Sequence, residues 1–391
     1  MIEKIIFITV HKFDLRDYRR FGIEILEQSG FKVEVWYISN ILYPKLSRSN
    51  IAQEVYSFSG LKLFKDKTEA YLSLSNLPKS TFIINFLSYS FNNLWVYRAI
   101  SKSDSDYAVL CVNVIPVPSV KRNGIGIFKE ALKKISSYRY LTTWKRLFVK
   151  LPLRFLGVKP ARFILAGGDR CFNYHYPVGR HTEILQIHAF DYDIYLKEKT
   201  ELFSDKPIAV FLDEFFPFHP DYALIGRECP LKPNKYYQLL NKFFDLIERE
   251  TGLEVVIAEH PRSRYEDFPD IFKGRKHVKG KTINLVKESK LVLSHCSTAL
   301  NFANLFYKPV IFIICSDLKD TWEHLQIMET AKWFGKKPVF IDTCSNFNLE
   351  AELEMNREAY DNYRRAYIKI EQSEDIPFWQ IVANRIKKED R

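Results

Sequence analysis

Short apolar runs alternate with helical patterns between residues 253 and 314, and this alternation constrains the fold more than any other feature of the sequence. The runs 253–259, 291–294 and 310–314 are rich in Val, Ile and Leu, whereas 282–289 has a helical pattern. Strands separated by helices form a parallel sheet. Ligands of such sheets bind beyond the carboxyl ends of the strands, so the polar residues at those ends are the first candidates for a site.

Two of these runs end in polar residues. The run 253–259 is followed by four residues that stop the strand or carry polar groups: His260, Pro261, Arg262 and Ser263. The run 291–294 leads to Ser297 and Thr298, just before a helical pattern. A hydroxyl at that position is expected to cap the helix, and the open amides of a helix start attract phosphate. Alternatively, His260 is only a hydrogen-bonded residue at a strand end, and the two hydroxyls are only caps.

The first half of the chain continues the same pattern. Apolar runs lie at 5–10, 31–38, 81–86 and 107–114, and a helix is expected over 16–28. The turn after the first run has no Gly-x-Gly-x-x-Gly motif, so a dinucleotide cofactor is not implied. A chain of 391 residues is also too long for one ordinary core, which predicts two domains.

The polar run 197–206 is the best candidate for a domain boundary, because a new apolar run begins directly after it at residue 207. We therefore predict an α/β fold with two Rossmann-like domains, residues 1–200 and 201–375, and a cleft between them. The last segment, 376–391, is apolar on one side and is expected to pack back on the first domain.

Acids and histidines also follow other predicted strands. These candidates for the cleft are His11, Asp14, Asp169, Asp191, Asp193, Asp213, Glu214 and His219. A carboxylate at a strand tip can act as a general base. Asp169 follows two glycines, which let the backbone turn sharply or approach a ligand closely. Simpler explanations are that Asp14 caps the first helix and that Asp169 belongs to an ordinary turn.

The net charge of +11 is concentrated in one segment of the chain. Residues 131–160 hold eight Lys or Arg side chains and no acid, interleaved with aromatic and aliphatic residues, and include Lys145, Arg146 and Lys150. That mixture suits an anionic membrane surface. A basic surface helix with a core face is the simpler alternative, and a nucleic-acid partner is not expected because no binding module is recognisable.

The sequence predicts a cytoplasmic protein. No apolar run approaches the ~20 residues that cross a bilayer, and the N-terminus is too short and strand-like for a signal peptide. The six cysteines are scattered without a close pair, which argues against zinc sites and a disulfide framework. With the basic segment, this favours a peripheral position on the inner membrane.

Two Rossmann-like halves without a dinucleotide motif resemble the GT-B glycosyltransferases, which bind the acceptor on the first domain and the nucleotide sugar on the second. Within that outline, His260-Pro261 followed by Ser297-Thr298 resembles the His-Pro and Ser-Ser/Thr motifs of bacterial sialyltransferases and polysialyltransferases. His-Pro also occurs in transferases that use CMP-Kdo. The resemblance covers only the second domain and implies that His260 contacts CMP while the two hydroxyls bind its phosphate.

The acidic residues depart from the pattern of those families. The families carry an acidic pair followed by glycine in the first domain, which supplies the base. Here Asp213-Glu214 is followed by Phe215 and begins the second domain, so the pair is not carried over as the base. Our order of candidates for the base is Asp169, Asp14 and then Asp213.

The resemblance implies an inverting transferase that moves a sialic-acid-like nonulosonate or Kdo from its CMP donor to a surface glycan, free or lipid-linked. CMP leaves with one phosphate, for which hydroxyls, amides and a cation such as Arg262 or Lys281 suffice, so no metal or cofactor is expected to be required. Asp191-x-Asp193 is similar to the metal-binding pair of some glycosyltransferases, but its place beside the linker favours a structural role. The alternatives are a UDP- or GDP-sugar donor, CDP-glycerol, or a membrane-surface scaffold without activity.

The membrane interpretation predicts the effect of reversing charge in the basic segment. Replacing Lys145, Arg146 and Lys150 together by glutamate should release the protein from vesicles that contain anionic lipid, because repulsion then replaces attraction. Vesicle co-sedimentation measures the bound fraction. Equal binding of the wild type and the triple variant would count against membrane contact through this segment.

Overall fold

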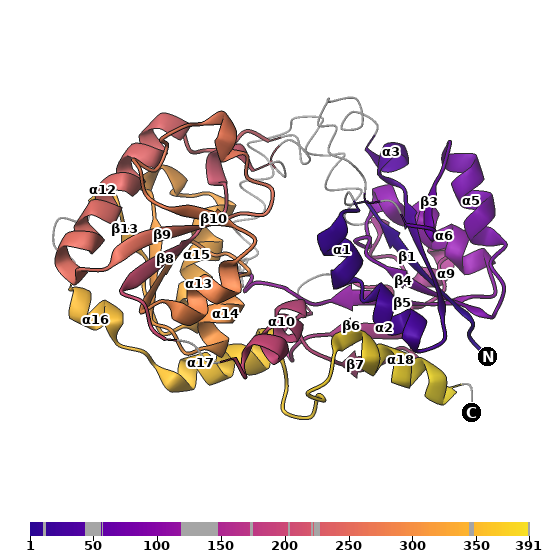
Figure 1. Cartoon of the computed structure of the whole chain (residues 1–391). Coiled ribbons are helices and arrows are strands. Elements are labelled where there is room, and N and C mark those ends of the chain that lie inside the picture. Colours follow the sequence, from indigo (N-terminus) through magenta and orange to yellow (C-terminus); the bar gives the residue numbers. More distant parts are fainter. Residues whose placement is uncertain are drawn as a thin grey trace, which may run out of the picture.

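The computed structural model describes residues 1–10, 13–43, 56, 58–118, 148–172, 175–201, 204–219, 222, 227–343 and 348–389. Within these residues the chain forms two domains that face each other, each built on a parallel sheet covered by helices (Figure 1). The predicted α/β architecture with two Rossmann-like domains is therefore confirmed.

The described strands of the first sheet lie in the order β3-β2-β1-β4-β5-β6-β7. Their bounds are β1 (Lys4–Thr9), β2 (Lys32–Tyr37), β3 (Leu61–Leu63), β4 (Thr81–Asn85), β5 (Asp106–Cys111), β6 (Phe163–Ala166) and β7 (Glu183–Gln186). The four apolar runs predicted in the first half correspond to β1, β2, β4 and β5. β3 has only three residues, too few to show a period.

The described strands of the second sheet lie in the order β10-β9-β8-β11-β12-β13. Their bounds are β8 (Ile208–Leu212), β9 (Glu254–Glu259), β10 (His277–Lys279), β11 (Leu291–Ser294), β12 (Val310–Ile314) and β13 (Val339–Phe340). The order places β8 in the middle, with β9 on one side and β11 on the other. Loops that follow these three strands therefore emerge side by side.

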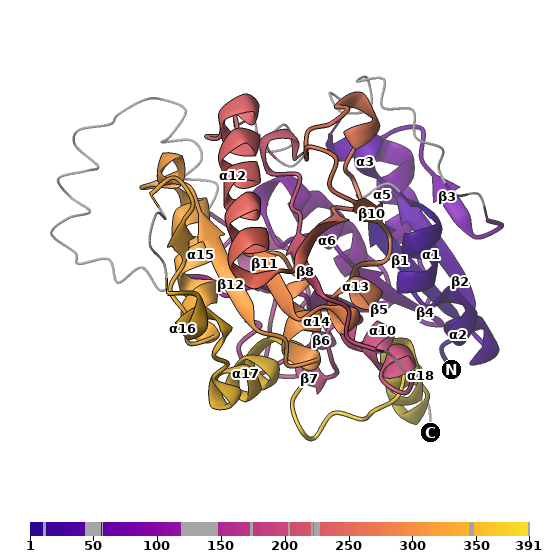
Figure 2. The same cartoon turned by 60° about the vertical axis from the view of Figure 1, so that its left-hand side comes forward.

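Helices cover both faces of each sheet (Figures 1 and 2). In the first half they are α1 (Leu15–Arg20), α2 (Ile23–Gln28), α3 (Ser39–Leu42), α5 (Lys67–Ser75), α6 (Leu94–Lys102), α9 (Leu153–Leu156) and α10 (Phe190–Glu198). In the second half they are α12 (Pro233–Thr251), α13 (Thr282–Glu288), α14 (Leu300–Leu305), α15 (Trp322–Trp333), α16 (Leu349–Leu353), α17 (Arg357–Tyr363) and α18 (Phe378–Glu389).

Burial on both faces explains why the strands of the second sheet are apolar throughout. In β8, Phe211 packs with α12 in one core, whereas Val210 and Leu212 pack with α13 and α14 in another. Alternate residues of a strand point to opposite faces, so a strand covered on both sides has no place for a polar residue until it ends. The first polar residues after such a strand therefore mark the edge of the sheet.

The predicted helix over 16–28 is wrong, because two helices occupy this range. Gly22 separates α1 from α2 with φ of 55°, a left-handed conformation that favours glycine. A Cβ at this position would lie 2.2 Å from Cδ1 of Trp379, a residue of the last helix. The break thus admits α18, which packs in the core of the first domain.

The chain crosses between the domains at α10 and again between α17 and α18 (Figure 1). Where it returns, the backbone of Ala366 passes directly over Gly168, at the end of β6. A Cβ on Gly168 would lie 2.4 Å from the Ala366 carbonyl oxygen, so the second glycine of this pair permits the close approach. The paired glycines therefore serve the contact between the two halves of the chain.

Candidate active site

Three adjacent loops at the carboxyl edge of the second sheet are joined by two acids. Asp213 follows the central strand β8, and its Oδ2 accepts a hydrogen bond from the backbone amide of His260, after β9, at 3.2 Å. Glu214 accepts one from the amide of Cys296, after β11, at 2.8 Å. The loops after β9 and β11, which were predicted to share a site, therefore both donate a hydrogen bond to the dipeptide Asp213-Glu214, from opposite sides of β8.

Asp213 holds these loops in place and has little capacity for other work. Its carboxylate is buried and also accepts hydrogen bonds from the Phe215 amide and the Tyr265 hydroxyl, both at 2.9 Å. Burial raises the pKa of Asp213 to about 6, although the amides of Phe215 and His260 oppose that rise. Because donors occupy both oxygens, Asp213 is better suited to positioning than to removing a proton from a substrate.

Phe215 adopts a backbone conformation that favours glycine. Its φ is 51°, in the left-handed region, and its ring is buried 5.2 Å from the ring of Tyr265. A bulky residue in this region is strained and persists only when its surroundings fix it. Here the surrounding aromatic packing and the bond to Asp213 fix the turn that directs Glu214 toward Cys296.

Glu214 has a pKa suited to exchange of a proton near neutral pH. The side chain is half-buried, and burial, with the charge of Asp213, raises its pKa to about 7. The amides of Cys296 and Ser297 oppose that rise. A carboxyl group that titrates near pH 7 can serve either as an acid or as a base.

His260 is a neutral side chain in one tautomer. Its Nδ1 accepts a hydrogen bond from the Arg262 amide at 3.2 Å, which leaves the ring proton on Nε2. Burial lowers the pKa of His260 to about 3, and the positive charge of Arg262 adds to this effect. The ring of His219 lies edge-on to it at 4.8 Å. The imidazole can therefore donate a hydrogen bond from Nε2 without carrying charge.

The other residues of the His-Pro junction have different surroundings. Pro261 is exposed and Arg262 is half-buried. Ser263 is buried, and its hydroxyl donates to Glu259 at 2.7 Å, so it stabilises the loop. Ser263 thus has its hydroxyl engaged within the protein.

The expected helix cap after β11 is wrong. The N-cap of α14 is Ala299, without a side-chain hydrogen bond, because the turn is closed by the Leu300 amide on the Ser297 carbonyl at 3.1 Å. The Ser297 hydroxyl accepts a longer bond from the Ala299 amide, at 3.3 Å, and Thr298 is exposed. The Thr298 hydroxyl is therefore open to a ligand.

Helix α1 is the part of the first domain that faces this edge (Figure 1). No residue within α1 was among the candidates from the sequence. Asp17 of α1 is buried, which raises the pKa of its carboxyl, and the charges of Arg16, Arg20 and Arg262 oppose that rise. Arg262 belongs to the second domain, and the charge of Arg16 likewise acts on His260. The i, i+4 spacing of Arg16 and Arg20 could have indicated them in the sequence, since it places both on one helix face.

The two acids of the first domain that were ranked as bases have structural partners. Asp14 caps α1, accepting a bond from the Asp17 amide at 2.8 Å. Asp169 is exposed, and its carboxylate lies 3.4 Å from Arg365 and 4.0 Å from Arg170. His11 lies outside the described residues.

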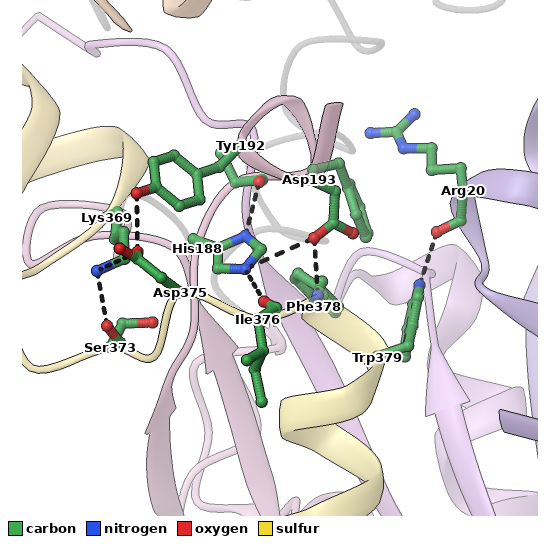
Figure 3. A network of polar contacts seen from close by, with 12 residues as sticks. Arg20, His188, Tyr192, Asp193, Lys369, Ser373, Asp375, Ile376, Phe378 and Trp379 are labelled. Atoms are coloured by element: carbon green, nitrogen blue, oxygen red, sulfur yellow. Dashed lines mark hydrogen bonds and ion pairs between the residues drawn. The ribbon is translucent and has the colours of Figure 1, made fainter. Parts of the chain in front are cut away.

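Asp191 and Asp193 lie in the first turn of α10 and not at the tip of a strand, so this part of the prediction is wrong; both residues join the two halves of the chain. The Asp191 carboxylate accepts bonds from Asn113 of the first domain, at 2.9 Å, and Asn301 of the second, at 2.8 Å. Asp193 accepts a bond from the Phe378 amide at 2.8 Å and lies 3.6 Å from His188 (Figure 3). Among the described residues, no three His, Cys, Asp or Glu side chains are grouped so as to hold a metal ion.

Part of the basic segment lies within the described chain. Lys150 is exposed, and beside it Leu151 and Phe155 are 43% and 68% exposed. Lys145 and Arg146 lie outside the described residues. None of the described helices is long and apolar enough to cross a lipid bilayer.

Comparison with known proteins identifies the fold. No family model matches the sequence, and no curated protein matches it. The structure resembles MnaA of S. aureus in its UDP co-structure, with 12% identity, coverage of 99% of this chain and 97% of that chain, and a TM-score of 0.51. It also resembles the wall teichoic acid polymerase TagF, with 12% identity, coverage of 99% and 90%, and a TM-score of 0.50. The chain has the GT-B fold.

The raised pKa of Glu214 predicts how stability changes with pH. The folded state holds the proton up to about pH 7, whereas an exposed carboxyl has a pKa near 4.5. The stability gained from this proton is complete below pH 4.5 and is lost as the pH rises through 7. The free energy of unfolding of Glu214→Gln minus that of the wild type should therefore rise by about 2 kcal/mol between pH 5 and pH 8.

Urea denaturation at pH 5, 6, 7 and 8 measures this difference. Glu228→Gln is a matched control, because Glu228 is exposed in the same domain. Its difference from the wild type should not change with pH. A pH-independent difference for Glu214→Gln as well would contradict the elevated pKa.

Proposed function

We propose that the protein is a glycosyltransferase that binds a nucleotide sugar at the carboxyl edge of the second sheet. The observation that carries this proposal is the convergence of the loops after β9 and β11 on Asp213 and Glu214. Parallel sheets bind ligands at this edge. The fold agrees, since MnaA was solved with UDP and TagF is a wall teichoic acid polymerase. Fold similarity alone leaves the reaction open, so the local chemistry carries the assignment.

The groups at this edge suit a nucleotide that carries one phosphate, which favours a CMP-linked donor. His260 offers a neutral N–H, Thr298 an exposed hydroxyl, and Arg262 a positive charge. These groups can neutralise the one phosphate of a departing CMP without a divalent ion. With the His-Pro and Ser-Thr motifs, this chemistry favours a sialic-acid-like nonulosonate or Kdo as the sugar, and a surface glycan as the acceptor.

In the proposed reaction an acceptor hydroxyl attacks the anomeric carbon while the bond from that carbon to the phosphate oxygen breaks. The electron pair leaves with CMP, and a carboxylate takes the hydroxyl proton. We assign that carboxylate to Asp17, which is buried in α1 and is acted on by the charge of Arg262 from the second domain. The other three candidates have partners within the protein. Asp14 accepts a bond from a helix amide, Asp169 lies beside two arginines, and Asp213 accepts three hydrogen bonds.

The basic segment supports a peripheral position on an anionic membrane. Phe155 and Leu151 are exposed beside Lys150, and Arg154 lies over the Phe155 ring at 4.7 Å. Exposed rings and aliphatic chains next to cations fit the headgroup layer of a bilayer. A lipid-linked glycan would then meet the enzyme at that surface.

Nucleotide binding by the purified protein tests the donor assignment. CMP should raise the melting temperature more than CDP, UDP or GDP, and His260→Ala should weaken CMP binding at least tenfold, about 1.4 kcal/mol, since the N–H donor is lost. His181→Ala is the control, because His181 is an exposed histidine of the first domain.

A larger rise in melting temperature with UDP, GDP or CDP than with CMP would indicate that the donor is a UDP-sugar, a GDP-sugar or CDP-glycerol instead. No shift with any nucleotide, or equal CMP affinity of His260→Ala and the wild type, would contradict a nucleotide site at this edge.

A further inference from the structure

Glu259, the last residue of β9, is a buried acid directly before the His-Pro loop, residues 260–263. Its side chain is only 8% exposed. One carboxylate oxygen, Oε1, lies 2.6 Å from Nδ1 of His277, and the other, Oε2, accepts a bond from the Ser263 hydroxyl at 2.7 Å. A carboxylate is stable in a buried place only when donors face it. Glu259 therefore connects His277, on the edge strand β10, to the last residue of the loop.

The His-Pro loop is held at both ends. At its start, the His260 amide donates a hydrogen bond to Asp213 at 3.2 Å. At its end, the Ser263 amide donates to the His260 carbonyl at 2.9 Å, and Nζ of Lys279 donates to the Ser263 carbonyl at 2.6 Å. Lys279 is the last residue of β10. The central strand of the sheet thus fixes the start of the loop, and the edge strand fixes its end.

We propose that His277 is a positioning residue for the nucleotide, because through Glu259 it fixes the loop that presents the His260 imidazole to the donor's phosphate. The inference rests on the proposed function, in which Nε2 of His260 donates a hydrogen bond to that phosphate. An N–H group contributes to binding only at hydrogen-bond distance and with the right direction. Support from the residues behind a binding group therefore sets the affinity as much as the group itself does.

The contact between His277 and Glu259 has a defined donor. An ionised carboxylate only accepts hydrogen bonds, so Nδ1 of His277 carries the proton in this pair. Alanine at position 277 removes the donor, and the buried carboxylate then loses one of its bonds. Asparagine carries an amide N–H at nearly the position of Nδ1 and can replace it. The two substitutions separate the hydrogen bond from the imidazole ring.

Amide hydrogen exchange of the ligand-free protein and isothermal titration with CMP test this role on the full chain. His277→Ala should speed exchange at the amides of the loop and weaken CMP binding about tenfold, because the loop is no longer fixed at its end. His277→Asn should keep both quantities within about threefold of the wild type, because it restores the donor. Lys276→Ala is the matched control, since Lys276 is exposed directly before β10, and it should change neither quantity. Urea denaturation should show that all variants are folded.

A double-mutant cycle tests whether His277 acts through Glu259. Ser263→Ala removes the donor to the other carboxylate oxygen. Because both substitutions disturb one carboxylate, the double variant should bind CMP at most about threefold more weakly than the weaker of the two single variants. Single effects that simply multiply in the double variant would contradict a route through Glu259.

The ligand-free measurement separates this proposal from the proposed function. Faster exchange in the loop of His277→Ala, in a protein that binds no nucleotide, supports the hold of His277 on the loop while the proposed function fails. Three results would each overturn the positioning role, even where His260→Ala shows that the nucleotide site is real. They are loop exchange equal to that of the wild type, faster exchange with unchanged CMP affinity, and equal loss of affinity in His277→Asn and His277→Ala.

Discussion

The two acids after the central strand of the second sheet hold the candidate site together. Asp213 fixes the start of the His-Pro loop, and Glu214 fixes the loop after β11, each through a backbone amide. A buried carboxylate that receives two or three hydrogen bonds defines one geometry for the groups around it. Separation of the loop after β9 would take the His260 amide and the Tyr265 hydroxyl from the buried Asp213, and separation of the loop after β11 would take the Cys296 amide from Glu214. Loss of hydrogen bonds to a buried acid costs more than the bonds themselves contribute. The elevated pKa values of both acids reflect the same burial.

The junction between the domains has a similar design. The Asp191 carboxylate takes one amide from each domain, while Gly168 allows the returning chain to pass within contact of the first sheet. Trp379 of the last helix packs against Gly22 and bonds to the Arg20 carbonyl. These contacts fix the end of α1 against the second half of the chain. The orientation of α1, and with it the direction of Arg20 and Asp17, therefore depends on residues at the far end of the sequence.

Local patterns predicted the second sheet and its polar edge well, because strands buried on both faces must be apolar until they end. His260, Ser297 and Glu214 could be found in this way. The partners of Asp191 could not, since Asn113 and Asn301 lie 78 and 110 residues away in sequence and no local pattern joins them. The ion pair of Asp169 could not be found for the same reason, because Arg365 comes from the second crossing of the chain. The break in the predicted first helix likewise depends on Trp379, a contact made only in the folded chain.

Amide hydrogen exchange on the full chain, with and without saturating CMP, tests the convergence of the three loops most directly. One ligand held by groups on all of them should slow exchange at 213–215, 260–263 and 296–299 together, and leave α6 and β4 of the first domain unchanged. Slower exchange in one of these loops without the others, or no change in any of them, would contradict a single site built around Asp213 and Glu214.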